Sequence, residues 1–292
     1  MIKKKIDIIV NPASGLKKQM FIENYVEQNL NTDRFTPSIH YTKKPGDANR
    51  LAKNAVRSGV EVVVAAGGDG TINEIAQNLV GSESVLGIIP LGSGNGLAHH
   101  LRIPSNPARA IDVINRMYTK KIDTAEINHR VFVSIAGVGF DAKVAKKFAH
   151  TQKRGFLAYF NIIRKEYFLS REKRYHIQIN GKGINRKAFL ISLANSNQFG
   201  YNTIIAPNAR LDDGLIDICI VRKVPAIELP LIAHLLYWKQ IDKSKYVEYL
   251  QGKEITIVQS RKRTVNIDGE PIKLGKRLHI KINPLSLNII TP

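Results

Sequence analysis

The stretch Val60-Glu-Val-Val-Val-Ala-Ala-Gly-Gly-Asp-Gly-Thr71 decides the fold of this chain. Its first part, Val60–Ala66, is almost purely apolar and β-branched, which is typical of a strand covered on both faces. The strand leads directly into a glycine-rich turn, and a helix is expected from there through Leu79. A strand, a tight turn and a helix in this order predict one unit of a parallel α/β sheet.

The same arrangement recurs on both sides of this stretch. The strand Ile6–Val10 is followed by the turn Asn11–Gly15, and the strand Val85–Pro90 is followed by the turn Leu91–Gly96. The pattern also predicts a strand at Ser38–Tyr41 and helices around Lys18–Leu30, from Asp47 through Val56, and over Ala108–Met117. Strands separated by helices predict a doubly wound parallel-sheet domain over residues 1–123.

The pattern changes at Asp123, where we place the domain boundary. Alternation with a period of two becomes common, which predicts a mainly antiparallel, β-sandwich-like domain over residues 124–292. Two helical interruptions are expected, roughly Ala142–Phe168 and Ile227–Trp238. The alternating apolar residues are Tyr175, Ile177 and Ile179, then Leu278, Ile280 and Ile282, then Leu285, Leu287 and Ile289.

Charge is the strongest signal in the composition. Forty-four Lys and Arg against twenty-four Asp and Glu give a net charge of +20, so an anionic partner is expected. Nucleic acid is disfavoured, because no nucleic-acid motif is present and aromatic residues do not interleave with the basic runs. The basic segments Lys143–Lys147, Lys153–Arg154 and Arg171–Arg174 instead suggest peripheral contact with an anionic membrane surface.

No segment predicts a span across a membrane. The N-terminus lacks the apolar run of about 7–15 residues that a signal peptide needs. The most apolar segment, Ala226–Trp238, is shorter than the roughly 20 residues of a spanning helix. We expect it to be a core helix, with a membrane-touching element as the alternative. The single Cys219 excludes an internal disulfide, and we expect a cytoplasmic, peripherally membrane-associated protein. The sequence leaves the oligomeric state open, and a homodimer is one of the possibilities.

Three glycine-rich turns follow parallel strands, at the sheet edge where ligands of such folds collect. Glycine lets backbone N–H groups approach phosphate oxygens, and the next helix N-terminus adds positive potential. A single turn of this kind could be purely structural, but three in one sheet favour a phosphate site. Neither a Walker A loop nor a GxGxxG fingerprint with its acidic partner occurs, which disfavours redox use of NAD(P).

These motifs resemble, in order and spacing, those of the diacylglycerol kinase catalytic-domain family. Gly67-Gly-Asp-Gly-Thr71 with Ile72-Asn-Glu74 is similar to its nucleotide-binding signature. The other matching elements are Asn11-Pro-Ala-Ser-Gly15, Pro90-Leu-Gly-Ser-Gly-Asn95, Leu211-Asp-Asp-Gly-Leu215 and Asp268-Gly-Glu-Pro271. The resemblance covers nearly the whole chain and implies the two-domain architecture that NAD kinases are thought to share.

The resemblance implies that the chain binds ATP and Mg²⁺ on these loops. The backbone of Gly67–Thr71 would cradle phosphates, and Asp69 would help to hold the catalytic Mg²⁺, which prefers one or two carboxylates. The residues predicted to bind the nucleotide are Asn11, Ser14, Gly15, Thr42, Gly67, Gly68, Asp69, Gly70, Thr71, Ile72, Asn73, Gly92, Ser93, Gly94 and Asn95.

The resemblance also assigns roles in the second domain. Glu270 is favoured as the base that takes the proton of a lipid hydroxyl, with Asp268 as a metal or water partner, although the sequence leaves open which of the two takes the proton. Without the resemblance, the Asp-Gly pair would read as a solvated hairpin turn. Asp213 corresponds to a ligand of a structural Mg²⁺, with backbone carbonyls of Arg210 and Leu215, although Asp212-Asp213-Gly214 could equally be an ordinary turn.

One departure from the family pattern leaves the lipid open. Many bacterial members carry an acidic residue directly after the third motif's asparagine, whereas this chain has Gly96, as in the sphingosine and ceramide kinase branch. The predicted function is an ATP- and Mg²⁺-dependent kinase of a membrane lipid such as diacylglycerol or a sphingoid base. The alternatives are a NAD kinase and a non-catalytic nucleotide- or lipid-sensing regulator.

Overall fold

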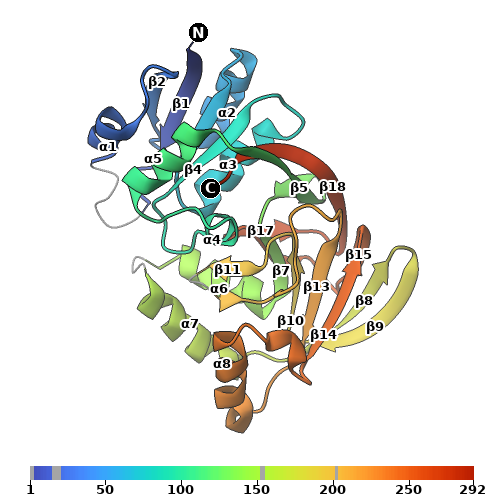
Figure 1. Ribbon diagram of the computed structural model, residues 1–292. Coiled ribbons are helices and arrows are strands. Elements are labelled where there is room, and N and C mark those ends of the chain that lie inside the picture. The colour runs from blue at the N-terminus through green and yellow to red at the C-terminus, as the bar shows by residue number, and fades with distance from the viewer. Residues whose placement is uncertain (1–2, 15–20, 152–154, 201–202) are drawn as a thin grey trace. The chain divides into compact units, whose positions relative to one another are not determined.

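The computed structural model describes residues 3–14, 21–151, 155–200 and 203–292 and divides the chain into two compact units (Figure 1). The first unit contains residues 1–123 together with 284–292, and the second contains residues 124–283. The C-terminal residues Pro284–Pro292 therefore lie with the first unit, although they follow the second in the sequence. Each unit is described by itself.

The first unit is built on a parallel sheet with the strand order β2-β1-β3-β4. Ile289, near the end of β18 (Arg277–Ile290), pairs in parallel with Leu86 of β4 and adds a further strand. All residues of the central strand β3 are buried, as its apolar sequence predicts. The bounds are β1 Lys4–Val10, β2 Phe35–Tyr41, β3 Val62–Gly67 and β4 Val85–Pro90.

Helices connect these strands, which confirms the predicted doubly wound arrangement. Asn106 caps α5 by accepting the N–H of Arg109, with Pro107 in the first turn. Glu74 of α3 accepts the N–H groups of Gly46 and Asn49 at the start of α2. The bounds are α1 Ile22–Asn29, α2 Asp47–Arg57, α3 Asp69–Leu79, α4 Gly96–His100 and α5 Pro107–Arg116. Residues 18–20 of the first predicted helix lie outside the described residues.

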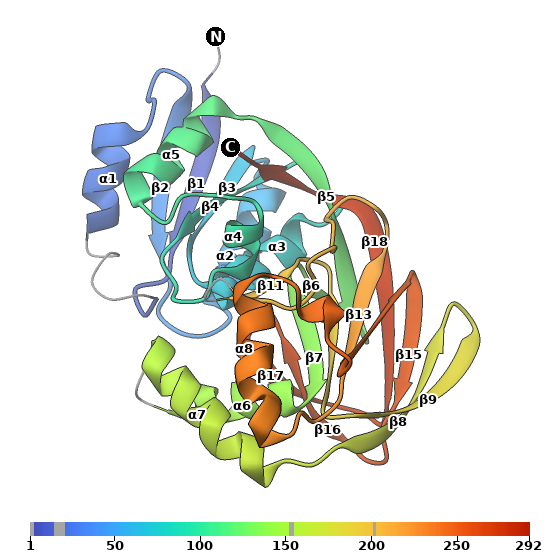
Figure 2. The same cartoon turned by 60° about the horizontal axis from the view of Figure 1, so that its bottom comes forward.

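The second unit consists mainly of antiparallel strands, as the period-two alternation predicts. One sheet has the order β14-β13-β10-β7-β16-β17, and the other runs from β18 through β15 and β8 to β9 (Figure 2). The bounds are β5 Thr119–Ile127, β6 Arg130–Phe132, β7 Ile135–Gly139, β8 Lys173–Ile179, β9 Lys182–Ala188, β10 Leu190–Ala194, β11 Gln198–Gly200, β12 Thr203–Ile204, β13 Ile216–Val221, β14 Val247–Gly252, β15 Glu254–Val258, β16 Arg263–Ile267 and β17 Glu270–Leu274.

Both sheets of the second unit contribute to one buried core. Val138 and Leu193 come from the first sheet, and Ile177, Ile257 and Ile280 come from the second. All five side chains are fully buried. This is the arrangement of a β-sandwich, in which inward-facing residues alternate with outward-facing ones along each strand.

The first predicted helical interruption contains two helices instead of one. Helix α6 is Phe140–Ala149 and helix α7 is Phe156–Leu169. Gly155 lies directly before α7 with φ of +97°, a backbone conformation that glycine adopts without a steric penalty. Gly155 thus marks the start of the second helix.

The prediction that Ala226–Trp238 forms a core helix is wrong. It forms a 3-10 turn, η2 (Ala226–Glu228), followed by helix α8 (Leu229–Tyr237), and no residue of either is buried. A second 3-10 turn, η3 (Ile241–Lys243), follows. One side of α8 packs through half-buried residues on a small apolar cluster, and the other side is exposed.

The alternation predicted for the last strand also fails at one position. Leu285 is 49% exposed with φ of +45°, and its N–H donates to the Asp123 carboxylate. Leu287 and Ile289 are fully buried, as expected. Leu285 follows Pro284, where β18 passes from the second unit to the first, so the regular pleat is interrupted there. In the described part of the chain, no helix is long and apolar enough to span a membrane.

Candidate functional site

The first two glycine-rich turns are joined by a side-chain hydrogen bond. Strands β1 and β3 are neighbours in the parallel sheet, so their carboxyl ends lie together. The Asn11 side-chain amide donates to Thr71 Oγ1 at 3.0 Å, and Asn11 Oδ1 accepts the N–H of Ala13. Asn11 therefore holds the turn after β1 against the start of α3.

The second and third turns meet through glycine backbones. A Cβ atom at Gly92 would lie 2.6 Å from the Gly68 Cα and 2.8 Å from Asn95 Oδ1. The N–H groups of Leu91 and Gly92 both donate to the Gly67 carbonyl. Only glycine at these positions allows the two loops to approach so closely.

Replacing Gly92 with alanine is expected to destabilise the first unit. The added Cβ would overlap the Gly68 backbone, which cannot rotate away as a flexible side chain could. Overpacking of this kind costs about 1–3 kcal/mol in the free energy of unfolding, measurable by thermal or urea denaturation. Gly70→Ala is the matched control, since a Cβ there would meet no atom within 4 Å. Equal stabilities of the two variants would contradict the proposed close approach.

Asp69 connects the start of α3 to the third turn. Its carboxylate accepts the Asn95 N–H at 2.8 Å and the Gly96 N–H at 2.7 Å. Burial raises the pKa of the Asp69 carboxyl, and the N–H groups of Gly96 and Asn95 act in the opposite direction. Asn95 has φ of +53°, and its buried Oδ1 has no hydrogen-bond partner among the described residues.

The other predicted nucleotide residues differ in what they can offer a ligand. Thr42, directly after β2, is buried, and its N–H donates to the Val10 carbonyl. Ile72 is 1% exposed, so its side chain belongs to the core. Gly15 lies outside the described residues. Gly70 and Ser93 are exposed, whereas Ser14, Gly68, Asn73, Gly92 and Gly94 are half-buried.

In the second unit, Asp268 and Gly269 form the turn between β16 and β17. Both have positive φ, +45° and +88°, as a two-residue hairpin turn requires. Asp268 is only 5% exposed. Its carboxylate accepts three backbone N–H groups at 2.8–2.9 Å, from Val133, Ser134 and Ile135. The turn is thus anchored to the start of β7 and the two residues before it instead of being solvated.

Glu270 is the first residue of β17 and is exposed. It pairs with Ile267 directly across the hairpin, so the anchored turn fixes the position of its backbone. Asp268 has both carboxylate oxygens engaged, whereas no hydrogen bond or ion pair of the Glu270 carboxylate occurs within the described residues. Of the two acids, Glu270 is the one free to meet a substrate.

The predicted metal residues of the second unit lie in a turn before β13. Asp213 Oδ1 accepts the Leu215 N–H at 3.0 Å, and Arg210 pairs with Asp212 at 3.2 Å. The described residues contain no group of three or more His, Cys, Asp or Glu side chains arranged to hold a metal. Asp213 and Asp69 lie in different units.

Comparison with known proteins identifies the family. The model of the diacylglycerol kinase catalytic domain matches residues 5–127. A second model, the YegS C-terminal NAD kinase beta sandwich-like domain, matches residues 134–291. A diacylglycerol kinase of Staphylococcus carnosus is 31% identical, with 92% of this chain and 89% of the relative covered. The chain belongs to the diacylglycerol kinase family.

Further relatives agree with this assignment. A diacylglycerol kinase of Staphylococcus aureus is 30% identical, with 92% of this chain and 87% of the relative covered. The crystal structure of a putative diacylglycerol kinase from Bacillus anthracis superposes with a TM-score of 0.80 at 23% identity, covering 99% of this chain and 97% of that one. The fold is therefore that of these kinases, and the chain is a lipid kinase whose family implies the use of ATP.

Sequence reasoning missed two residues that lie beside the Asp268 turn. Asp141, in the first turn of α6, is 6% exposed and accepts a 2.9 Å hydrogen bond from the Asn266 amide of β16. Asn266 Oδ1 is buried and has no hydrogen-bond partner in the described part of the chain. A Cβ at Gly137 would lie 1.9 Å from Asp141 Oδ2, so this glycine makes room for the carboxyl. Only tertiary packing reveals this pair.

The buried Asp141 is expected to make stability depend on pH. Burial raises its pKa from 3.8 to about 6, against the opposing hydrogen bond from Asn266. The folded state therefore holds this proton more tightly than the unfolded state. The contribution of the Asp141 carboxyl to the free energy of unfolding is fully present below pH 3.8 and is lost as the pH rises through about 6. The stabilisation that is lost amounts to about 3 kcal/mol, because one pKa unit corresponds to about 1.4 kcal/mol.

Asp141→Asn is expected to remove this loss. The variant should be more stable than the wild type at pH 8, by up to about 3 kcal/mol, and should show a flatter stability profile between about pH 4 and 6. Urea unfolding across this range measures the effect, with the exposed Glu254→Gln as a control for removing one acidic group. An unchanged slope in Asp141→Asn would show that this carboxyl does not titrate as its burial predicts.

Proposed function

We propose that this chain transfers the γ-phosphate of ATP to a hydroxyl of diacylglycerol. The observation that carries the proposal is the double hydrogen bond of the Asp69 carboxylate to Asn95 and Gly96. It joins the second and third glycine turns into one set of loops at the carboxyl edge of the sheet, where ligands of this fold class bind. Phosphoryl transfer depends mainly on positioning and charge neutralisation, which such loops supply.

Mg²⁺ is the metal we propose for the reaction. The donor set fits, because carboxylate and carbonyl oxygens are the hard ligands that Mg²⁺ prefers, and it completes its shell with water and substrate phosphates. Asp69 would hold the catalytic ion, and Asp213 with the carbonyls of Arg210 and Leu215 would hold a structural one. When bound, the catalytic ion would neutralise charge developing on the phosphates.

Glu270 is the proposed base for the lipid hydroxyl, and Asp268 is proposed to position it. An exposed carboxylate that makes no hydrogen bond or ion pair within the described residues can accept a proton from an incoming hydroxyl. Asp268 is engaged by three backbone amides, so its contribution is to hold the hairpin on which Glu270 stands. Peripheral contact with an anionic membrane, where the lipid resides, is also part of the proposal.

A sphingoid base is the second candidate acceptor, favoured by Gly96 after the third motif. Two observations favour diacylglycerol: the named relatives and the model of the catalytic domain. The experiment that decides is transfer of labelled γ-phosphate from ATP to a panel of lipids in mixed micelles with Mg²⁺. Labelling of diacylglycerol is expected. Labelling of a sphingoid base instead would change the acceptor, and ATP binding without labelling of any lipid would overturn the proposal.

NAD is the remaining phosphate acceptor to include in the panel, because the GGDGT element is common to NAD kinases. Formation of NADP from NAD and ATP, without lipid labelling, would assign the chain to that activity. If neither phosphorylated lipid nor NADP forms, a nucleotide-sensing regulator remains as the alternative.

A further inference from the structure

A pocket of about 760 Å³ opens on the second unit between the end of α7 and the turn that follows β13. Five cationic side chains line it against one carboxylate: Arg171, Lys173, Arg174, Lys187 and Lys223 against Glu172. Tyr167, Phe168, Val224, Pro225 and Ala226 form the apolar part of its wall. Neither the nucleotide-binding residues nor the proposed base is among these residues.

Little of the positive charge of this pocket is neutralised within the described residues. Glu172 accepts the backbone N–H of Lys223 at 2.8 Å, and no ion pair of the five cationic side chains occurs in the described ranges. Lys173 is half-buried, and its pKa is lowered by burial and then by Arg263, Lys143 and Arg261 nearby. Concentrated positive charge with this little compensation favours an anionic ligand.

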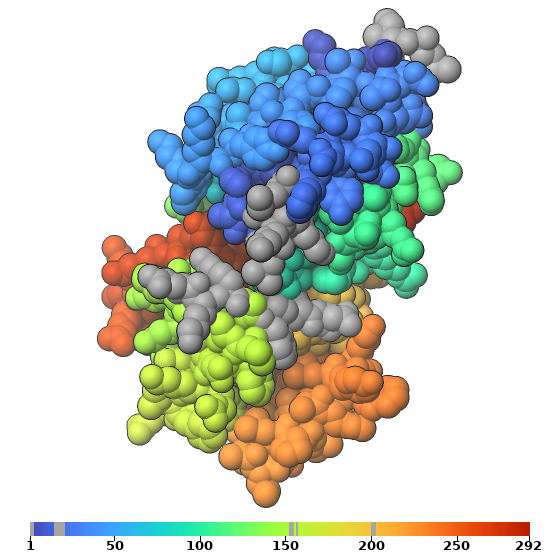
Figure 3. Space-filling view, turned by 90° about the vertical axis from the view of Figure 1, so that its left-hand side faces the viewer, coloured from blue at the N-terminus to red at the C-terminus, as the bar shows by residue number. Residues whose placement is uncertain are grey.

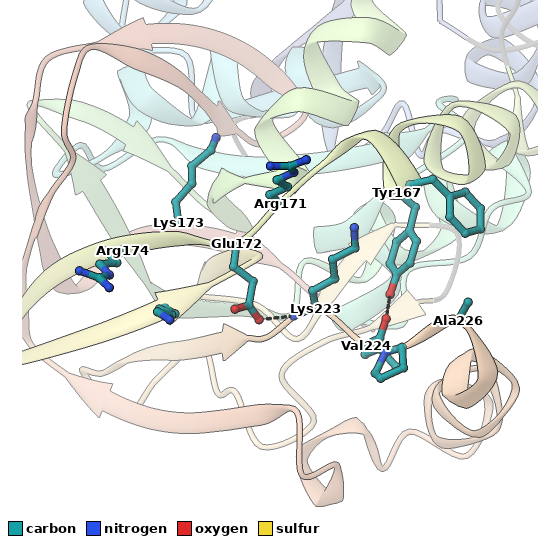
Figure 4. Close-up of a pocket in the computed structure, with 11 residues that line it drawn as sticks. Tyr167, Arg171, Glu172, Lys173, Arg174, Lys223, Val224 and Ala226 are labelled. Carbon is teal, nitrogen blue, oxygen red and sulfur yellow. Dashed lines mark hydrogen bonds between the residues drawn. The ribbon is translucent and has the colours of Figure 1, made fainter.

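The protein holds one of the cationic side chains, that of Lys223, in place. The Lys223 ammonium donates to the Ser170 carbonyl at 2.6 Å and lies over the Tyr167 ring at 5.5 Å from its centroid. The Tyr167 hydroxyl donates to the Val224 carbonyl, which closes the wall of the pocket. In Figure 4, the side chains of Arg171, Lys173 and Lys223 extend in the same direction, whereas Arg174 extends away from them.

Exposed apolar side chains are concentrated on the helices that adjoin this pocket. Eight of the twelve large apolar side chains exposed in the described residues belong to α7, η2, α8 and the residue after α8. Helices α7 and α8 lie on neighbouring parts of the surface (Figures 2 and 3). The eight are Leu157, Phe160, Phe168, Leu169, Ile227, Leu231, Tyr237 and Trp238, with exposures between 51% and 87%.

We propose that this pocket binds the phosphate group of an anionic phospholipid while the exposed apolar side chains of α7 and α8 enter the bilayer. This inference rests on the proposed function, which brings the chain to a membrane, and names the residues that dock there. Lipid is favoured over a soluble phosphate because the cationic wall borders a large apolar surface. Aromatic residues such as Tyr237 and Trp238 are suited to the boundary between headgroups and acyl chains.

The experiment measures vesicle binding by sedimentation, with phosphatidylcholine vesicles compared with vesicles that also contain phosphatidylglycerol. Arg171→Gln/Lys173→Gln is expected to weaken binding to the anionic vesicles about 25-fold, since each basic residue near such a surface contributes about fivefold. The control pair, Lys253→Gln/Lys281→Gln, removes the same charge from exposed positions outside the pocket and should change binding less than fivefold. If Arg171→Gln/Lys173→Gln does not fold, the exposed pair Arg171→Gln/Lys187→Gln replaces it.

Trp238 reports on the bilayer contact, because it is the only tryptophan of the chain. Its fluorescence is expected to shift to shorter wavelength on anionic vesicles and to be quenched by brominated acyl chains. Equal losses of binding in the pocket and control pairs would overturn the proposal in favour of diffuse charge. Absence of any preference for anionic vesicles, or an unchanged Trp238 spectrum on bound vesicles, would also overturn it.

Inorganic phosphate distinguishes the two sources of the anion. A soluble phosphate that displaces the protein fully from vesicles at low concentration would assign the pocket to that ligand and overturn the lipid assignment. Sedimentation requires no catalysis, so failure of the wild type to phosphorylate a lipid would count against the proposed function alone. The vesicle data would then test separately whether the pocket binds anionic phospholipid.

Discussion

Asp69→Asn is expected to reduce phosphate transfer to lipid by about 10³-fold or more. The substitution preserves the size of the side chain but removes the charge proposed to hold Mg²⁺. It also places an amide against the N–H groups of Asn95 and Gly96, where the wild type has two acceptor oxygens. The loss should therefore combine weaker metal binding with displacement of the third glycine turn.

Single-turnover kinetics with labelled ATP, measured over a range of Mg²⁺ concentrations, separates these two contributions. Partial recovery at high Mg²⁺ would indicate weakened metal binding, whereas loss at every concentration would indicate a displaced loop. Asp112→Asn is the control, since it removes one carboxylate from an exposed position of α5. Retention of activity within tenfold in Asp69→Asn would exclude a direct role for this carboxylate.

Glu270→Gln is expected to lower kcat by about 10²–10⁴-fold, the usual contribution of a general base. The side chain is exposed and makes no hydrogen bond within the described residues, so the free energy of unfolding should change little. Steady-state kinetics at saturating ATP, together with urea unfolding, measures both quantities. An active Glu270→Gln would rule this residue out as the base.

Asp268→Asn is expected to differ from Glu270→Gln, because it should lower the free energy of unfolding. An asparagine keeps only one acceptor for the N–H groups of Val133, Ser134 and Ile135 and turns an amide toward them. A buried donor left unsatisfied costs about 1–3 kcal/mol. If Asp268→Asn instead keeps full stability and loses kcat, the two residues would exchange their proposed roles.

The predicted parallel sheet and its glycine turns depend on local features. Val62–Gly67 is buried along its whole length, as its apolar sequence predicts. The glycine-rich stretches follow β1 and β4 as expected, whereas the one predicted at Gly67–Thr71 is shorter, because β3 ends at Gly67 and α3 begins at Asp69. Phosphate-binding loops need glycine for close backbone approach, so they leave a signal in the sequence itself. The alternation in β8 and β18 likewise predicts the faces of an antiparallel strand.

Exposure and partners depend on residues far away in the chain and could not be predicted. Residues 226–238 are as apolar as a core helix, yet no residue of η2 or α8 is buried, because the sandwich already has a complete core without them. Asp141 carries no motif, and it acquires its raised pKa only through packing near Asn266, more than a hundred positions later.

The sequence by itself determined the class of both domains and the places of the glycine-rich loops. Those properties follow from backbone conformation and side-chain periodicity, which act over a few residues. The roles expected for Asp268 and Glu270 came from the family resemblance. Only the tertiary structure decided that Asp268 is anchored by the amides of Val133–Ile135 while Glu270 is exposed, and that the last nine residues lie with the first unit. Burial and long-range hydrogen bonds separate two neighbouring carboxylates that the sequence cannot distinguish, because both depend on strands brought together by folding.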